Sequence, residues 1–188
     1  MRIKISEMVA YETGVHVGDG NMYSYERIRR ITYSGNLKNE KEFYKNILPK
    51  IIKKVYGVNP ILVERPRDNT IILIVNSKAL VEFKNKILGL PIGSKNRIEI
   101  PKAIMNNRKL IRWFMRGLGD TDFSLSFQKN RKGLHTEPRL ELYTRSEKLI
   151  KDLKTVLETF NFKFAIESQE KRNYRGFMLS LIHISEPT

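Results

Sequence analysis

The sequence predicts a mixed α and β protein (α/β or α+β) made of two copies of one αββαββα unit, the second without its last helix. Three observations predict this fold. Patterns of helix, strands, helix and strands fill the first part of the chain and then recur, which indicates an internal duplication. Each copy opens on a helix that carries small residues and ends at an aspartate. The 188-residue chain is also strongly basic, with 35 Lys+Arg against 20 Asp+Glu and a formal net charge of +15, which favours a polyanionic partner.

The first copy, residues 1–88, opens on a helix that Ser6 can cap and that runs through Gly18. Residues 22–34 are rich in aromatic and β-branched side chains, which predicts one long strand or a hairpin. Residues 39–57 predict an amphipathic helix because apolar residues recur at helical spacing. Its buried face is expected to consist of Phe43, Ile47, Ile51 and Val55.

Residues 60–77 predict a second hairpin, with the segment RPRDN as its turn. A closing helix, residues 78–88, is expected to cover the sheet of this copy. The residues that it should bury are Leu80, Phe83, Ile87 and Leu88. A connector, residues 89–106, leads to the second copy.

The second copy, residues 107–178, begins at Asn107, a suitable cap for its first helix. Two alternating segments, FSLSFQKN and PRLELYT, predict strands, with Leu125 and Phe127 facing the core. Ser146 can cap the next helix, and a hairpin follows. No closing helix follows, so the sheet should expose apolar side chains such as Phe164, Ile166 and Phe177. Residues 179–188 match a translated sequencing adapter, which predicts a processing artefact and a truncated chain.

The opening helices of the two copies break local rules in the same way. Each glycine inside a helix costs roughly 1 kcal/mol relative to alanine. Small residues nevertheless recur four positions apart, at Gly14 and Gly18 in the first helix and at Gly117 and Thr121 in the second. Such a stripe lets two helix backbones approach closely, so we expect these helices to pack on each other at the centre of the fold.

An aspartate directly follows each stripe, at Asp19 and Asp122. Packing through the stripes would bring two carboxylates and two negative helix ends together, and these repel one another unless a cation lies between them. Oxygen ligands with open positions suit Mg²⁺ (or Mn²⁺), bound partly by water and by a substrate phosphate. The expected metal ligands are Asp19, its neighbour Gly20, and Asp122, whereas Asp120 is expected to be solvated or capping.

At these residues the sequence resembles the LAGLIDADG homing endonucleases in their monomeric, two-motif form, with ETGVHVGDG and MRGLGDTDF as the motifs. The resemblance covers residues 1–178. It implies curved antiparallel sheets that form a saddle over the DNA major groove, and a long, imperfectly palindromic target site. It also implies metal-assisted hydrolysis of both strands across the minor groove, with Asp19 and Asp122 as catalytic metal ligands and 3′ overhangs as products. Lys95 is the nearest match to the family's basic catalytic residue, and Phe123 replaces the last glycine of the motif, where a left-handed cap would cost about 1–2 kcal/mol.

Outward side chains of the strands and basic turns are expected to bind this DNA. Strand residues suit base edges and loop cations suit phosphates; Arg27 and Arg29 are expected to share one strand face. The expected DNA-binding residues are Arg27, Arg29, Arg65, Arg67, Ser124, Ser126, Gln128, Lys129, Arg139, Glu141 and Tyr143.

Two other functions stay open at this point. One is a non-cleaving nucleic-acid binder of the same fold, such as an intron-splicing maturase or a regulator; the other is a D-x-D transferase, for which no nucleotide-binding glycine loop is present. The absence of cysteine excludes disulfides and thiolate metal sites. No stretch has the length of a membrane span, so we expect no membrane partner and an intracellular protein, cytoplasmic (nucleoid-associated) or organellar. The family resemblance implies a monomer.

Overall fold

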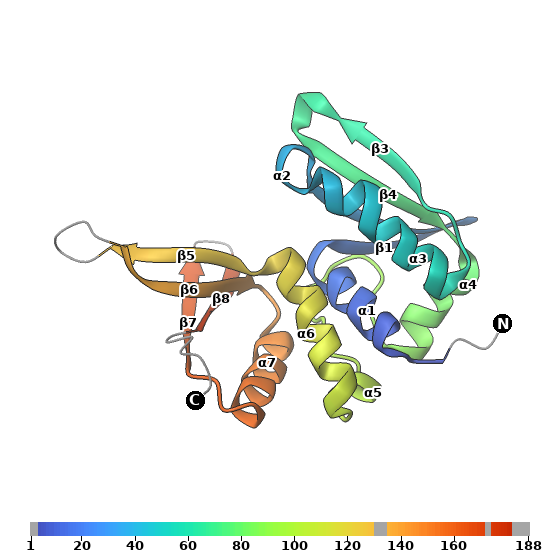
Figure 1. Ribbon diagram of the computed structural model, residues 1–188. Helices are drawn as coiled ribbons and strands as arrows, with labels where there is room; N and C mark the ends of the chain where they lie inside the picture. Colours follow the sequence, from blue (N-terminus) through green and yellow to red (C-terminus); the bar gives the residue numbers. More distant parts are fainter. Residues whose placement is uncertain (1–3, 130–134, 172–173, 182–188) are drawn as a thin grey trace. The chain divides into compact units, whose positions relative to one another are not determined.

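The computed structural model describes residues 4–129, 135–171 and 174–181. Contacts divide the chain into two units, the first combining Met1–Lys95 with Pro101–Thr121 and the second combining Asn96–Ile100 with Asp122–Thr188. Each unit contains one four-stranded antiparallel sheet, which several helices cover in the first unit and the helix α7 covers in the described part of the second (Figure 1). The unit boundary falls at the end of the second glycine helix, whereas the sequence repeat begins at that helix.

The sheet of the first unit has the strand order β1-β2-β4-β3. Its strands are β1 (Gly20–Tyr25), β2 (Ile28–Asn36), β3 (Ile61–Arg65) and β4 (Thr70–Asn76). Of the two alternatives for residues 22–34, the structure has the hairpin, with its turn around Glu26 at φ 47°. The second hairpin forms as predicted, through the 3₁₀ helix η2 (Pro66–Asp68). One face of the sheet is buried under helices, and its core residues are Met22, Ile31, Tyr33, Ile71, Leu73 and Val75.

The helices of this unit include two π-helical turns. The elements are α1 (Glu7–Asp19), α2 (Leu37–Glu42), the π turn η1 (Phe43–Ile47), α3 (Leu48–Tyr56), α4 (Lys78–Glu82), the π turn η3 (Phe83–Ile87), α5 (Lys102–Met105) and α6 (Arg108–Asp122). Ser6 caps α1 as predicted, because its hydroxyl accepts a hydrogen bond from the Val9 amide at 3.3 Å. No helix of the described residues is both long and apolar enough to cross a membrane.

The face predicted for helix 39–57 is wrong by one residue. The buried stripe consists of Tyr44, Leu48, Ile52 and Tyr56 instead of Phe43, Ile47, Ile51 and Val55, and Ile47 is 45% exposed. Aromatic or aliphatic residues occupy both neighbouring stripes, so spacing alone cannot choose between them. The π turn also adds a residue to the local repeat, so this helix departs from the regular 3.6-residue period that the prediction assumes.

The closing helix covers the sheet as predicted, but its buried residues differ. Leu80 and Leu88 are buried, whereas Ile87 is 63% exposed and Phe83 is only partly covered. Lys84 takes the inner position and is fully buried. An ion pair with Glu12 stabilises this lysine there, which a pattern of apolar residues does not reveal.

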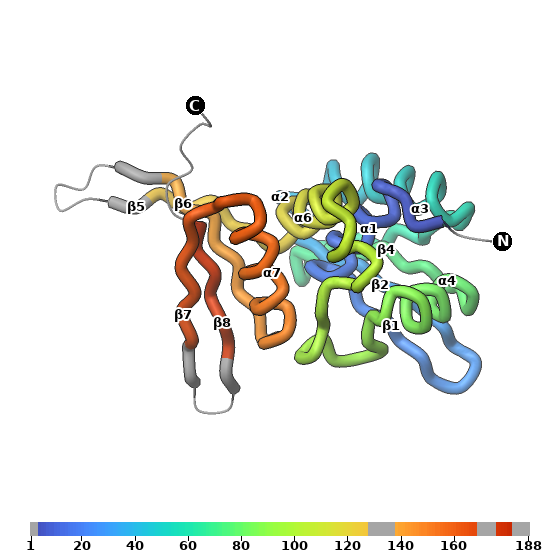
Figure 2. The backbone as a smooth tube through the Cα atoms, turned by 90° about the horizontal axis from the view of Figure 1, so that it is seen from below, coloured from blue at the N-terminus to red at the C-terminus, as the bar shows by residue number. Residues whose placement is uncertain are grey.

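The second unit repeats the strand order, as β5-β6-β8-β7. Its elements are β5 (Ser124–Lys129), β6 (His135–Thr144), α7 (Glu147–Thr159), β7 (Phe164–Lys171) and β8 (Tyr174–Leu181). Ser146 caps α7, which packs against β6 and β8 (Figure 2). Residues 179–181 belong to β8 and residues 182–188 lie outside the described residues, so the adapter origin of 179–188 stays a prediction.

The exposed apolar residues of this sheet are not those predicted. Leu125 lies opposite Leu140 and shares its sheet face with buried Leu142, but Leu125 and Phe127 are 58% and 53% exposed. The prediction that they enter the core is wrong because α7 packs mainly on β6 and β8. Phe177, predicted to be exposed, is buried.

Candidate functional site

The helices α1 and α6 cross at two glycines, in direct backbone contact. A Cβ atom on Gly14 would lie 2.1 Å from the carbonyl oxygen of Phe114, and a Cβ atom on Gly117 would lie 2.0 Å from that of Tyr11. Real Cβ atoms do not approach so closely, so both positions require glycine. The Thr121 hydroxyl points back to its own helix and donates to the carbonyl of Gly117 at 3.2 Å.

A side-chain bond adds to this crossing. The Tyr11 hydroxyl donates to Asp120 Oδ2 at 2.7 Å. Burial and the neighbouring carboxylate raise the pKa of Tyr11. Asp120 is exposed, as the sequence suggested, but it also links α6 to α1.

Asp19 ends α1 and is held by a buried tyrosine. The hydroxyl of Tyr44, which is 0% exposed, donates to Asp19 Oδ2 at 2.7 Å. Lys95 lies at the same helix end, where its ammonium donates to the carbonyl oxygens of Val17, at 3.0 Å, and Gly18. A cation at this end of a helix interacts favourably with the macrodipole.

The residue after each motif helix needs no left-handed backbone. Gly20 follows α1 with φ −80° and ψ 152°, an extended conformation. Glycine is required there because a Cβ atom would lie 2.6 Å from His16. Among the described non-glycine residues, positive φ angles occur only at Glu26, Asn69 and Asn161. The cost predicted for Phe123 in a left-handed cap therefore does not arise.

Asp122 ends α6 just as Asp19 ends α1, and each follows its crossing glycine at the same spacing. These carboxylates are hard oxygen donors of the kind that Mg²⁺ or Mn²⁺ binds together with water and phosphate oxygens. Within the described residues, no group of three or more His, Asp or Glu side chains is arranged to hold a metal alone. The chemistry of the donors fits a divalent metal that is completed by substrate.

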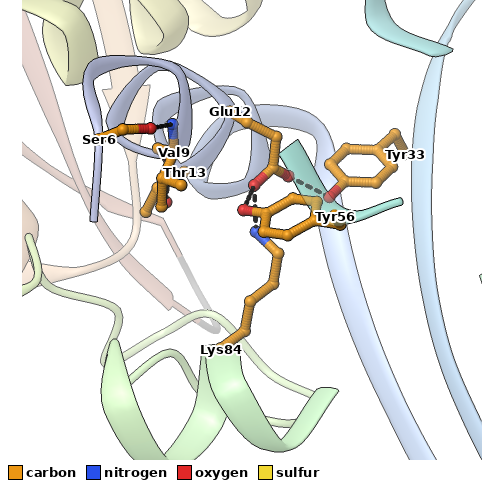
Figure 3. Close-up of polar contacts among 7 residues, drawn as sticks. All are labelled: Ser6, Val9, Glu12, Thr13, Tyr33, Tyr56 and Lys84. Carbon is orange, nitrogen blue, oxygen red and sulfur yellow. Dashed lines mark hydrogen bonds and ion pairs between the residues drawn. The ribbon is translucent and has the colours of Figure 1, made fainter. Parts of the chain in front are cut away.

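A buried polar network lies beside α1, and the sequence reasoning missed it (Figure 3). Lys84 Nζ lies 2.6 Å from Glu12 Oε2, and both side chains are 0% exposed. The hydroxyls of Tyr33 and Tyr56 each donate to the same carboxylate. Burial and this carboxylate raise the pKa of both tyrosines, whereas burial lowers the pKa of Lys84. The sequence signal that could have indicated this network is Glu12, an acidic residue among small and apolar residues of α1.

His16 completes the interior of this region as a neutral ring. It stacks edge-on against Tyr33 with ring centroids 5.7 Å apart. Burial, with smaller contributions from Lys84 and Lys95, lowers its pKa well below the ordinary value. Its buried Nδ1 atom has no hydrogen-bond partner among the described residues.

Arg27 and Arg29, the predicted DNA-binding arginines of the first hairpin, do not lie on one face of a strand. Arg27 lies in the turn, and Arg29 lies opposite Ser24 on the helix-covered side, so the expectation that they share a strand face is wrong. Arg30 takes the open face, opposite Tyr23. The β1–β2 pairing ends at Tyr25 and Ile28, so Arg27 lies in the turn, and the alternation of side chains along β2 does not include it.

A basic hollow of about 360 Å³ lies at the junction of this hairpin and β4. Its lining residues are Arg27, Ile28, Arg29, Arg30, Asn76, Ser77 and Lys78. Asn76 accepts from Arg30 Nε at 2.9 Å, which fixes one of the four cations. Arg65 and Arg67, at the turn of the second hairpin, are also exposed.

The open face of the second sheet is polar, as the alternation predicted. Glu141 is held by Ser126 at 3.3 Å and by Ser180 at 3.5 Å. Tyr143 lies over Gly176, where a Cβ atom would come within 1.9 Å of its hydroxyl. Further predicted residues of this face are the exposed Ser124 and the half-buried Arg139. Gln128 and Lys129 belong to β5, but their side chains lie outside the described part of the structure.

Comparison with known proteins agrees with this architecture. Residues 109–186 match the model of the LAGLIDADG-like domain family. This segment of the chain is similar to a LAGLIDADG-like domain. This confirms the resemblance seen in the sequence. No curated protein sequence matches the chain.

Solved structures match the fold over nearly the whole chain. A structure of I-DmoI in complex with DNA and Mn is 16% identical, with a TM-score of 0.69 over 95% of this chain and 90% of that one. Mesophilic variants of the homing endonuclease I-DmoI are 16% identical, with a TM-score of 0.67 over 93% of this chain and 88% of theirs. Full-length DUF199/WhiA from Thermatoga maritima is 17% identical, with a TM-score of 0.55 over 95% of this chain and 51% of that one. These similarities establish the duplicated LAGLIDADG fold.

Proposed function

We propose that the chain is a site-specific DNA endonuclease that makes double-strand cuts by metal-assisted hydrolysis of phosphodiester bonds. The observation that carries this proposal is the pair of glycine-crossed helices, each ended by an aspartate, in a LAGLIDADG fold. The homing endonuclease I-DmoI, which shares the fold, has been crystallised with DNA and Mn, and with DNA and Ca. A net charge of +15 supports a nucleic-acid substrate.

In this proposal the carboxylates of Asp19 and Asp122 bind Mg²⁺ or Mn²⁺, with Gly20 adjoining the first of them. The bound ion would polarise a phosphate and activate water. The protein contributes the placement of its carboxylates: Tyr44 holds Asp19 by a hydrogen bond, and the Gly14–Gly117 crossing fixes α1 against α6. Lys95, bonded to the last carbonyls of α1, adds a positive charge beside Asp19 that suits the substrate phosphate.

The open faces of the two sheets are the proposed DNA surface, on a long, imperfectly palindromic duplex bound by a monomer. Arg30 and Tyr143 face outward from strands and suit base edges. The basic hollow suits a backbone phosphate because four cations line it and no carboxylate does. Arg27 and Arg29 are thereby assigned to phosphate contacts, which set affinity and its salt dependence, and not to base contacts.

Selection from a randomised duplex library tests this function. The full chain with Mg²⁺ or Mn²⁺ should enrich cleaved duplexes of one sequence family, and the ends should carry 3′ overhangs. Asp19→Asn and Asp122→Asn should each abolish cleavage yet retain binding of the selected duplex. Glu158→Gln is the control, because this exposed carboxylate of α7 belongs neither to the expected metal ligands nor to the proposed DNA surface, and cleavage should be unchanged. Specific binding without any metal-dependent cleavage would assign the chain to the non-cleaving binders, maturase or regulator.

A further inference from the structure

The two π turns of the first unit are related in sequence and in what they contact. The segments are FYKNI in η1 and FKNKI in η3, each with phenylalanine first and isoleucine last. In each turn the second residue, Tyr44 or Lys84, is 0% exposed. Each of these side chains bonds to a carboxylate of α1: Tyr44 to Asp19 and Lys84 to Glu12. π turns are rare, and they are found frequently at functional sites.

Each turn places a polar group in an otherwise apolar stripe. Tyr44 belongs to the stripe that continues through Leu48 and Ile52, and Lys84 lies between Leu80 and Leu88. A buried polar group is costly unless it is paired, so each side chain favours the one position of α1 that offers it a carboxylate. The two contacts together fix α1 near its middle, through Glu12, and at its end, through Asp19.

Tyr44 is itself tightly confined. A Cβ atom on Gly35 would lie 2.4 Å from Tyr44 Cε2, so the missing side chain on β2 makes room for the ring. Phe43 packs edge-on against it with ring centroids 5.7 Å apart. A ring confined by these two contacts presents its hydroxyl in one direction, as a group that orients a metal ligand must.

We infer that Tyr44 is a positioning residue for Asp19, and that the π turn η1 is the device that delivers its hydroxyl. The inference rests on the proposed function, since it gives Asp19 the role of a metal ligand. Tyr44 itself does not touch metal or substrate. Its hydrogen bond selects one orientation of the carboxylate, which reduces the entropy lost when a cation binds.

Mn²⁺ binding by the full chain, measured by electron paramagnetic resonance without DNA, tests the inference apart from activity. Loss of a partner that orients a metal ligand typically costs about 10–100-fold in metal affinity. Tyr44→Phe should therefore weaken Mn²⁺ binding at least about tenfold. Tyr56→Phe is the matched control: it removes another buried hydroxyl from the same helix stripe, but one that bonds to Glu12. It should lower the melting temperature as Tyr44→Phe does and leave Mn²⁺ affinity within about twofold.

Two outcomes separate the inference from the proposed function. If Asp19→Asn removes a Mn²⁺ site while Tyr44→Phe binds Mn²⁺ like the wild type, Tyr44 is only structural and the inference is overturned. If Asp19→Asn binds Mn²⁺ as the wild type does, Asp19 is not a metal ligand. The metal role of Asp19 in the proposed function is then wrong, whatever the result for Tyr44→Phe. A double variant, Tyr44→Phe with Asp19→Asn, should bind no more weakly than Asp19→Asn alone, because the tyrosine acts through the aspartate.

Discussion

The first unit buries ionisable side chains beneath its sheet, whereas the described core of the second unit is almost entirely apolar. Glu12, His16 and Lys84 are buried in the first unit; the only buried polar side chain described in the second is that of Ser146, which caps a helix. The strand order is the same in both. A shared topology therefore does not require a shared interior. The charged interior lies beside α1, the helix that ends at Asp19, and we interpret it as the means by which the position of that helix is specified.

Breaking the buried ion pair should give the largest effect. Lys84→Met leaves the Glu12 carboxylate buried without its cation, and loss of one partner of a buried pair costs about 3–5 kcal/mol. Urea unfolding of the full chain measures this loss. Adding Glu12→Gln should recover part of it, since the uncompensated charge is then gone. A double variant as unstable as the sum of the single variants would show that the two side chains are not coupled.

A leucine pair in the second unit tests where its apolar core ends. Leu142→Ala should destabilise by about 2–5 kcal/mol, because the side chain is only 1% exposed. Leu125→Ala changes a residue on the same sheet face that is 58% exposed, so its effect should stay within about 0.5 kcal/mol. Equal losses in urea unfolding would mean that Leu125 is covered in solution and that the core extends over β5.

The sequence was sufficient for features that depend on local chemistry. The Ser6 cap, the second hairpin of the first unit and the close-approach glycines Gly14 and Gly117 all follow from residue type and spacing. It was insufficient where two patterns compete. Apolar or aromatic residues occupy both stripes of helix 39–57 at the same spacing, so only packing against the rest of the unit decides which stripe is buried.

The site shows the same division. Asp19 and Asp122 were identified as the ends of the motif helices from sequence alone, because each directly follows a stripe of small residues. An aspartate is unfavourable at a helix C-terminus, which marked both positions as candidate functional residues. Tyr44 was not identified, since its bond to Asp19 joins residues far apart in the chain and depends on a π turn. Lys84 was not identified either, because its burial depends on an ion pair with Glu12, 72 residues earlier in the chain.

Two glycines of α6 should respond to alanine with opposite signs. Gly117→Ala forces a Cβ atom against the Tyr11 carbonyl and should cost at least the 1–3 kcal/mol typical of overpacking. Gly119 has no atom within 4 Å of such a Cβ, so Gly119→Ala should stabilise by up to about 1 kcal/mol through helix propensity. Thermal unfolding of both variants measures the difference. A neutral Gly117→Ala would contradict the backbone contact between α1 and α6.

The last expected effect concerns pH and again separates the two interiors. Burial lowers the pKa of His16 well below its ordinary value of 6.5, so the folded chain keeps this ring neutral where the unfolded chain protonates it. The unfolded state then binds one more proton, and the free energy of unfolding should fall as pH drops below 6.5, by up to about 1.4 kcal/mol per pH unit. His16→Gln should lose this part of the slope between pH 6.5 and 5 while retaining the contribution of the other titrating groups. Urea unfolding at several pH values gives both slopes, and their difference belongs to His16 alone. Parallel slopes for the two proteins would mean that the folded chain also protonates His16, and hence that water reaches the ring beside Tyr33.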